Sequence, residues 1–194
     1  MMRSLQLKRY SRARVWLDEI PVQAEMRGPT KQLHSRAGGQ LAASRSAVTV
    51  EWHIPLGPRS LYGLLGVEYT QLEGELRIET IDEEPQRKFE DSLTSRVSDN
   101  AFVGLASEFR EAVVKGILLE ANKDGSNMCG GLLIKGAVVC EVNSCEAIFE
   151  TLGRVVVALL RKSGDLEDDE LQSMLVYQQP FALTNNSPPA TPRG

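Results

Sequence analysis

The sequence has no apolar run of the length that a membrane helix needs, and only 6% of its 194 residues are aromatic. A helix that crosses a bilayer requires about 20 mostly apolar residues. Histidine occurs twice and cysteine three times, and the spacing of Cys129, Cys140 and Cys145 matches no common zinc pattern. We therefore expect no membrane span, no metal site and no cofactor.

The signatures of nucleotide and calcium chemistry are also missing. No G-x-x-x-x-G-K-[ST] loop is present to cradle a phosphate, and NKDG at residues 122–125 lacks the aspartate of a guanine-recognition motif. The acidic stretches IDEEPQ and DLEDDE lack the ligand spacing of a calcium loop. We predict a protein that is not an enzyme. The competing hypothesis is an enzyme that uses Cys145, as a thiolate in the first turn of a helix, or the region of His53.

Cysteine usage bears on the compartment. An odd number of cysteines and the lack of a secretory signal are typical of a reducing environment, so we expect a cytoplasmic location. The Arg-rich start MMRSLQLKRYSRARVW has an alternative interpretation as an organelle transit peptide, which the early Asp18 and Glu19 disfavour.

The charge is unevenly distributed along the chain. Residues 1–46 hold nine Lys and Arg against three Asp and Glu, a net +6, whereas residues 47–194 hold thirteen against twenty-three, a net −10. A basic segment of this kind suits an acidic partner such as RNA. The candidate RNA-binding residues all lie in this segment; they are Arg9, Arg12, Arg14, Arg27, Lys31, His34 and Arg36.

Hydrophobic periodicity predicts an α+β domain over residues 47–164. Residues 47–55, 64–71 and 75–81 alternate as strands do, and the last two are joined by a tight hairpin-like link. Residues 105–121 change to the helical period, and residues 131–142 form a strongly apolar, central strand. A second helix follows, so the order predicts a two-layer sandwich, a mainly antiparallel sheet with two helices on one face.

The second predicted helix starts in the stretch VNSCEAIF, residues 142–149. Asn143 stands three residues before Glu146, the spacing of a capping box. Apolar residues at Ile148, Leu152 and Leu159 then give the helix a buried face that ends near residue 162.

The two ends of the chain are predicted to lie outside this domain. Residues 1–46 are expected to form a mobile basic arm or a partly ordered lead, with one possible strand at residues 21–26. Residues 165–194 are expected to form an acidic and then Pro-rich disordered tail, in which one short helix remains an alternative.

Two stretches in this order resemble domain IV of translation elongation factor G. The family's helix motif V-P-x-x-Y-x-x-A-V-x-x-G-I is similar to GLASEFREAVVKGI, and its V-D-S-S-E-x-A-F motif is similar to VNSCEAIF. Positions of the two motifs are matched by Phe109, Ala112, Val113, Gly116, Ile117, Val142, Asn143, Ser144, Cys145, Glu146 and Phe149. The matches span about residues 102–162.

The resemblance implies a function as well as a fold. The family's domain IV carries a Gly-rich tip, S-G-G-R-G-Q-Y-G-H-V, that reaches the decoding region of the ribosome, and this chain has two candidate remnants, residues 35–40 and residues 60–69. Without the GTPase part, the resemblance implies a stand-alone, ribosome- or RNA-associated binding module. The alternative is a protein-interaction or regulatory module that keeps only the scaffold and binds a basic partner with its acidic surface.

Overall fold

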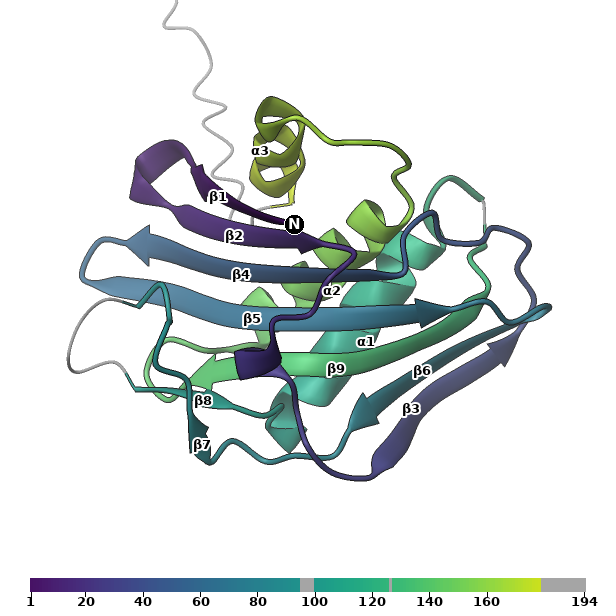
Figure 1. The fold of residues 1–194 in the computed structure, drawn as a ribbon, viewed down its shortest axis with the longest axis horizontal. Coiled ribbons are helices and arrows are strands. Elements are labelled where there is room, and N and C mark those ends of the chain that lie inside the picture. The colour runs from purple at the N-terminus through teal and green to yellow at the C-terminus, as the bar shows by residue number, and fades with distance from the viewer. Residues whose placement is uncertain (95–99, 126, 179–194) are drawn as a thin grey trace, which may run out of the picture.

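The computed structural model describes residues 1–94, 100–125 and 127–178, and these residues form one mixed α+β unit (Figure 1). The nine strands are β1 (Met2–Gln6), β2 (Arg12–Leu17), β3 (Thr30–Ala37), β4 (Ala47–Leu56), β5 (Arg59–Thr70), β6 (Glu75–Ile81), β7 (Arg87–Lys88), β8 (Ala101–Val103) and β9 (Gly130–Cys140). The helices are α1 (Ser107–Ala121), α2 (Glu146–Leu160) and α3 (Asp168–Tyr177). Helices α1 and α2 lie together behind the sheet, so the predicted two-layer α+β sandwich is confirmed.

The sheet runs in the order β1-β2-β4-β5-β9-β6-β3, with β8 beside the far end of β9 and β7 beside β8. All pairs are antiparallel except β6 with β9, which is parallel. The apolar strand β9 is central, as predicted. It also separates β5 from β6, so the predicted hairpin between these two strands is wrong. Because β9 is apolar on both faces, the place between two long strands is the one that buries it best.

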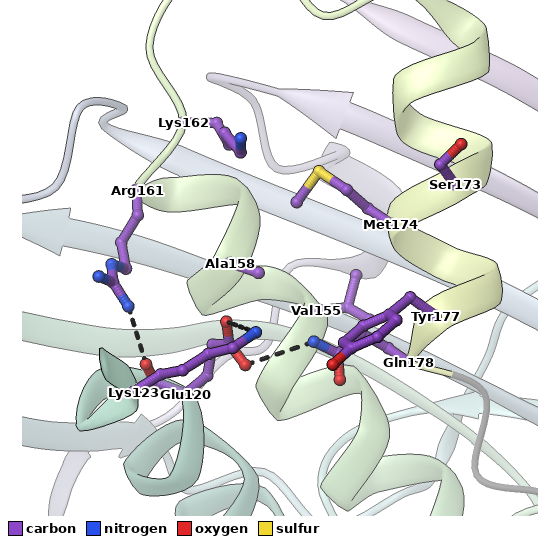
Figure 2. Close-up of a pocket in the computed structure, with 10 residues that line it drawn as sticks. All are labelled: Glu120, Lys123, Val155, Ala158, Arg161, Lys162, Ser173, Met174, Tyr177 and Gln178. Atoms are coloured by element: carbon purple, nitrogen blue, oxygen red, sulfur yellow. Dashed lines mark hydrogen bonds and ion pairs between the residues drawn. The ribbon is translucent and has the colours of Figure 1, made fainter. Parts of the chain in front are cut away.

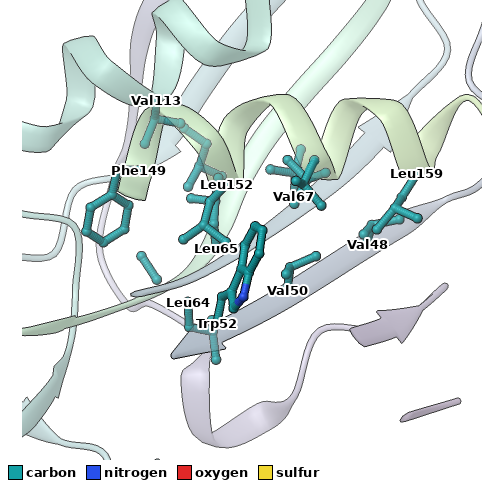
Figure 3. Close-up of a cluster of buried hydrophobic side chains, with 14 of the residues drawn as sticks. Val48, Val50, Trp52, Leu64, Leu65, Val67, Val113, Phe149, Leu152 and Leu159 are labelled. Carbon is teal, nitrogen blue, oxygen red and sulfur yellow. The ribbon is translucent and has the colours of Figure 1, made fainter. Parts of the chain in front are cut away.

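The core lies between the sheet and α2. Residues that stand opposite each other on antiparallel strands point to the same face, and this register places Val50, Trp52 and Leu65 toward the helices. Figure 3 shows these side chains beneath Leu152 and Leu159 of α2. All five are at most 1% exposed, so the predicted apolar face of the second helix is indeed buried.

Two glycines let α1 and α2 pack closely. A Cβ atom at Gly116 would stand 2.0 Å from the carbonyl oxygen of Glu150, and one at Gly153 would stand 2.7 Å from that of Val113. Near the same crossing the rings of Phe109 and Phe149 stack with centroids 4.9 Å apart. Several residues that carry the family resemblance are therefore packing residues of this helix pair.

The first 46 residues belong to the sheet and do not form a separate arm. Strands β1 and β2 extend it beyond β4, and β3 closes its opposite edge against β6. The predicted strand at residues 21–26 is instead the short 3₁₀ turn Val22–Ala24, in a segment that crosses the face opposite the helices. There the Met26 N–H donates to Lys135 O at 2.8 Å. A structural boundary at residue 46 is therefore absent.

The start of α2 differs from the predicted capping box. The N-cap residue is Cys145, and no side chain caps it. Asn143 is buried in the preceding turn, where its Nδ2 lies 3.7 Å from Cys140 Sγ. Asn143 cannot act as the cap because the turn at the end of β9 takes two more residues before the helix begins.

The predicted disordered tail starts with an ordered helix. α3 buries Leu171 and Leu175, and its first turn is held by Arg3 Nη1, which lies 3.3 Å from Asp168 Oδ1. A capping box between Glu167 and Glu170 begins this helix. Residues 179–194, the Pro-rich part of the predicted tail, lie outside the described residues.

Candidate anion-binding site at one end of the sheet

The seven predicted RNA-binding residues fall into separate groups. Arg12 and Arg14 lie on β2, near one edge of the sheet, with their side chains on the face opposite the helices. Arg9 lies in the short turn Lys8–Tyr10 just before β2. Arg27 is exposed in the connection that leads to β3, and its backbone N–H donates to Glu83 Oε2.

The other three residues lie at the opposite edge of the sheet. Lys31, His34 and Arg36 are on β3, which the strands from β4 to β6 separate from β2. The structure therefore does not bring the seven residues to one surface, because the sheet order places β2 near one edge and β3 at the other.

A hollow of about 470 Å³ gathers basic and polar residues at the end of the sheet where β4 turns into β5. We call this the hairpin-end site and define it by Tyr10, Arg12, His53, Arg59 and Asn143, all of which line the hollow. None of the described residues that line it carries a carboxylate. Arg12 and Arg59 therefore give the site a local positive charge within an acidic protein.

The β4–β5 turn places Arg59 at the tip. Leu56 pairs with Arg59, which leaves Gly57 and Pro58 as a two-residue turn. Gly57 has φ +70°, the left-handed backbone that glycine adopts at the first position of such hairpin turns. The Arg59 side chain is exposed and makes no hydrogen bond or ion pair with any described residue. Its guanidinium is thus available to a ligand.

The loop between β9 and α2 forms another wall of the site. Tyr62 N–H donates to Asn143 O at 2.9 Å, and Ser144 Oγ donates to Tyr62 O at 2.8 Å. These bonds fix the loop against the start of β5, while Val142 remains 77% exposed at its tip. Hydrogen bonds thus hold this wall against β5, and it ends in an apolar residue that faces solvent.

Tyr10 is the unusual residue of the site. Its φ is +62°, a conformation that a bulky non-glycine residue rarely adopts, and its side chain is 84% exposed. Such strain persists only where the surrounding structure imposes it, and it is often found at functional positions. Here it presents an aromatic ring to solvent beside Arg12.

Arg12 is positioned by the segment that crosses the sheet at residues 89–94. Its Nη2 donates to Leu93 O at 2.7 Å, and the register places it opposite His53 on β4. The Leu93 N–H in turn donates to the buried carboxylate of Glu51 at 2.7 Å. A chain of hydrogen bonds therefore connects the site to the interior of the sheet.

Glu51 is the centre of that interior network. Its side chain is fully buried, Tyr62 Oη donates to it at 2.9 Å, and Arg14 Nη1 lies 3.4 Å from Oε2. Burial raises the pKa of the Glu51 carboxyl above its ordinary value, against the opposing effects of the Leu93 N–H, Arg14 and Tyr62. Arg14, which also pairs with Asp91 at 3.1 Å, thus neutralises acidic groups of the protein itself. It is a structural cation more than a ligand-binding one.

A second hollow, of about 670 Å³, lies between the ends of α1 and α2 and the helix α3 (Figure 2). Apart from the exposed Lys162, its charged groups bind partners within the hollow. Lys123 Nζ and Gln178 Nε2 each lie 3.3 Å from a carboxylate oxygen of Glu120, and Arg161 Nη1 donates to Glu120 O at 3.0 Å. These contacts anchor α3. This hollow therefore has fewer charged groups available to a ligand than the hairpin-end site has.

Other chemistry finds little support in the described ranges. They contain no group of three or more His, Cys, Asp or Glu side chains placed to hold a metal ion. Cys145 is half-buried at the start of α2, and the buried Cys129 and Cys140 form no disulfide. Within the same ranges, no helix has the length and apolar character to cross a membrane.

Comparisons with models of known families, with curated proteins and with solved structures give no match.

Sequence reasoning missed Tyr10, Arg59 and the Glu51–Tyr62 pair. The signal for Arg59 was the Gly57-Pro58 pair between two alternating stretches, which marks a hairpin turn. Glu51 carried a weaker signal, a single carboxylate in an otherwise apolar strand. Nothing in the local sequence indicates the left-handed backbone of Tyr10.

Proposed function

We propose that this protein is a non-catalytic binding module that binds RNA through the hairpin-end site, as a ribosome-associated relative of elongation factor G domain IV would. The observation that carries the proposal is the site itself. Arg12, His53 and the unpaired Arg59 surround a hollow that no described carboxylate lines, next to the exposed ring of Tyr10. Cations beside an aromatic platform suit a flexible polyanion with stacking bases.

The positions of the resembling segments support the ribosomal setting. One candidate remnant of the family's tip begins at Ser60, and its Tyr62 hydrogen bonds with Asn143 and Ser144 of the VNSCEAIF stretch. Both segments therefore meet at the hairpin-end site. The other candidate, residues 35–40, begins on β3 at the opposite edge of the sheet. This arrangement favours residues 60–69 as the counterpart of the tip.

The test is binding of a fluorescent single-stranded RNA, followed by co-sedimentation with ribosomes. We expect Arg12→Glu with Arg59→Glu to weaken binding at least about tenfold. The slope of log binding constant against log salt concentration should also become shallower, by about one for each phosphate contact that the two arginines make. Lys162→Glu is the control, because Lys162 is an exposed cation at the end of α2, outside this site. Arg14→Glu is unsuitable because it would place a third carboxylate beside Glu51 and Asp91.

Two results would remove the proposal. One is RNA binding that ignores both salt and the double substitution. The other is an equal loss of binding in the Lys162→Glu control, which would indicate nonspecific attraction to surface charge.

A further inference from the structure

The outer edge of β3 is unpaired. β3 is the last strand in the sheet order and pairs only with β6 among the described strands. Its backbone N–H and C=O groups on the other side are therefore open to a further strand. An edge of this kind is the surface to which extended peptides add in β-augmentation.

The edge is basic on one face. The register pairs Lys31 with Thr80, His34 with Ile78 and Arg36 with Leu76, so all three side chains lie on the face that α1 and α2 cover. A β-bulge at residues 32–34 keeps them on that face although their spacing is uneven. The strand itself, TKQLHSRA, contains no acidic residue.

Hydrogen-bonding capacity is unused at this edge. His34 Nε2 and both Nε and Nη2 of Arg36 are shielded from solvent, and none has a hydrogen-bond partner among the described residues. Shielded polar atoms normally have partners, so each such atom needs an explanation. A carboxylate carried by an added strand would supply the missing acceptor.

A groove of about 750 Å³ runs between β3 and the outer side of α1. Leu33, Val114, Leu118 and the half-exposed Leu119 form its apolar part. The cations on its helix side are already paired, Arg110 with Asp82 at 2.7 Å and Lys115 with Glu150 at 2.7 Å. The exposed Glu111 is the acidic residue that lines it. The unpaired positive charge of this region therefore lies on β3.

We propose that the β3 edge binds an extended, acidic peptide segment of a partner protein, which adds a strand to the sheet, places carboxylates against Lys31, His34 and Arg36, and inserts an apolar side chain beside Leu33. This surface is separate from the hairpin-end site and does not depend on the proposed RNA function. The three basic residues explain the choice of occupant. They repel a second copy of the same edge, and they attract an acidic strand. RNA is a poorer occupant because β3 has no Phe, Tyr or Trp on which a base could stack, and its one imidazole, His34, has a solvent-shielded Nε2.

The test uses a fluorescein-labelled synthetic peptide of about nine residues, with threonine at odd positions and Glu, Leu, Leu and Glu at the even ones. This symmetric pattern reads the same in both directions, so it suits parallel or antiparallel addition. Anisotropy is measured for this peptide, for its Lys-for-Glu version, and for a version N-methylated at alternate residues, which cannot form ladder hydrogen bonds on that edge. A single-stranded RNA of similar length is the fourth probe.

We expect saturable binding of the acidic peptide alone. Lys31→Glu with Arg36→Glu should weaken it at least about tenfold, equivalent to about 1.4 kcal/mol. The matched control is Arg12→Glu with Arg59→Glu, which should bind this peptide like the wild type. If the β3 variant does not fold, the comparison of the unmodified and N-methylated peptides on the wild-type protein still tests whether the peptide adds as a strand.

The remaining outcomes overturn the proposal. The first is that the acidic peptide does not bind, and the second is that the N-methylated or Lys-containing version binds equally well. The third is that RNA binds at β3 in place of the peptide. The fourth is that the protein self-associates, that the Lys31 and Arg36 substitutions abolish this self-association, and that the peptide does not bind. Because the RNA variants and the β3 variants share no residue, failure here leaves the test of the hairpin-end site intact.

Discussion

At the hairpin-end site, different residues supply the positive charge and the ring for base stacking. Arg59 offers a guanidinium without a described partner, whereas Tyr10 offers an exposed ring held by a strained backbone. A cation that contacts phosphate and a ring that stacks on a base contribute differently to the salt dependence of binding. Substitution of each residue alone therefore distinguishes the two contributions.

We expect Tyr10→Ala to weaken binding of single-stranded RNA by about 1–3 kcal/mol with an unchanged salt slope, because stacking releases no counterions. The measurement is an anisotropy titration at several salt concentrations. Arg59→Glu is the comparison, and it should make the slope shallower. A shallower slope in Tyr10→Ala, or unchanged affinity, would mean that the ring does not stack on a base.

Glu51 makes stability depend on pH. Burial raises the pKa of its carboxyl above the ordinary 4.5, so the folded protein holds this proton to higher pH than the unfolded chain does. Stability from this group is therefore present below the unfolded pKa and is lost as pH rises through the folded pKa. Glu51→Gln is neutral at every pH and removes this dependence.

Urea unfolding at about pH 4, 6 and 8 tests the effect. Relative to Glu51→Gln, we expect the wild type to lose free energy of unfolding as the pH rises. The neutral amide beside Arg14 shifts the free energy of unfolding of Glu51→Gln by the same amount at every pH, so this shift does not affect the comparison. A difference between the two proteins that stays the same from acidic to alkaline pH would show that the carboxyl titrates normally.

At the scale of elements, the contact between α1 and α2 depends on glycine. Gly116→Ala would force a Cβ atom against the carbonyl oxygen of Glu150, and backbone can yield only by moving the helices apart. We expect it to lower the free energy of unfolding by about 1–3 kcal/mol or more, although alanine favours a helix. Chemical denaturation measures this loss.

Glu111→Ala is the matched control, since it also introduces alanine into α1 but at an exposed position. It should change stability by no more than about 0.5 kcal/mol. If Gly116→Ala is as stable as this control, the backbones of the two helices do not approach each other closely enough to require glycine.

The elements differ in how far sequence reveals them. α1 and α2 were predictable because their apolar residues recur at helical spacing, and β9 because it is one long apolar run. β2 also alternates, with Ala13 and Val15 buried between arginines, but its charge favoured the interpretation as a mobile basic arm or partly ordered lead. β3 has a single strongly apolar residue, Leu33, and is a strand only because the edge of β6 accepts it.

At the scale of the whole molecule, the sheet joins distant parts of the chain into one folding unit. Trp16 lies on β2 and Trp52 on β4, whereas most of the helical signal comes from α1 and α2. We expect tryptophan fluorescence and far-UV circular dichroism to report one coincident urea transition, as small single domains usually show. Two separated transitions would mean that an N-terminal segment unfolds independently of the helices.

Ile148→Asp, in the C-terminal half of the chain, also tests whether the protein unfolds as one cooperative unit. Ile148 is fully buried on α2, so a carboxylate there has no partner and should cost several kcal/mol. We expect both optical signals to shift together or to show an unfolded protein in buffer. Retention of the fluorescence signal alone would mean that β1, β2 and β4 fold without the helices.

The sequence by itself determined the layers. Apolar residues at helical spacing and one long apolar strand require a sheet with helices packed on it, because that arrangement buries them. Only the tertiary structure decided which polar residues meet. β2 pairs with β4 through residues 31 to 41 positions apart in the sequence. This pairing brings Arg12 to His53 and Arg59 and leaves Lys31, His34 and Arg36 at the other edge. Strand order is a global property, set by the best total burial, and no local pattern encodes it.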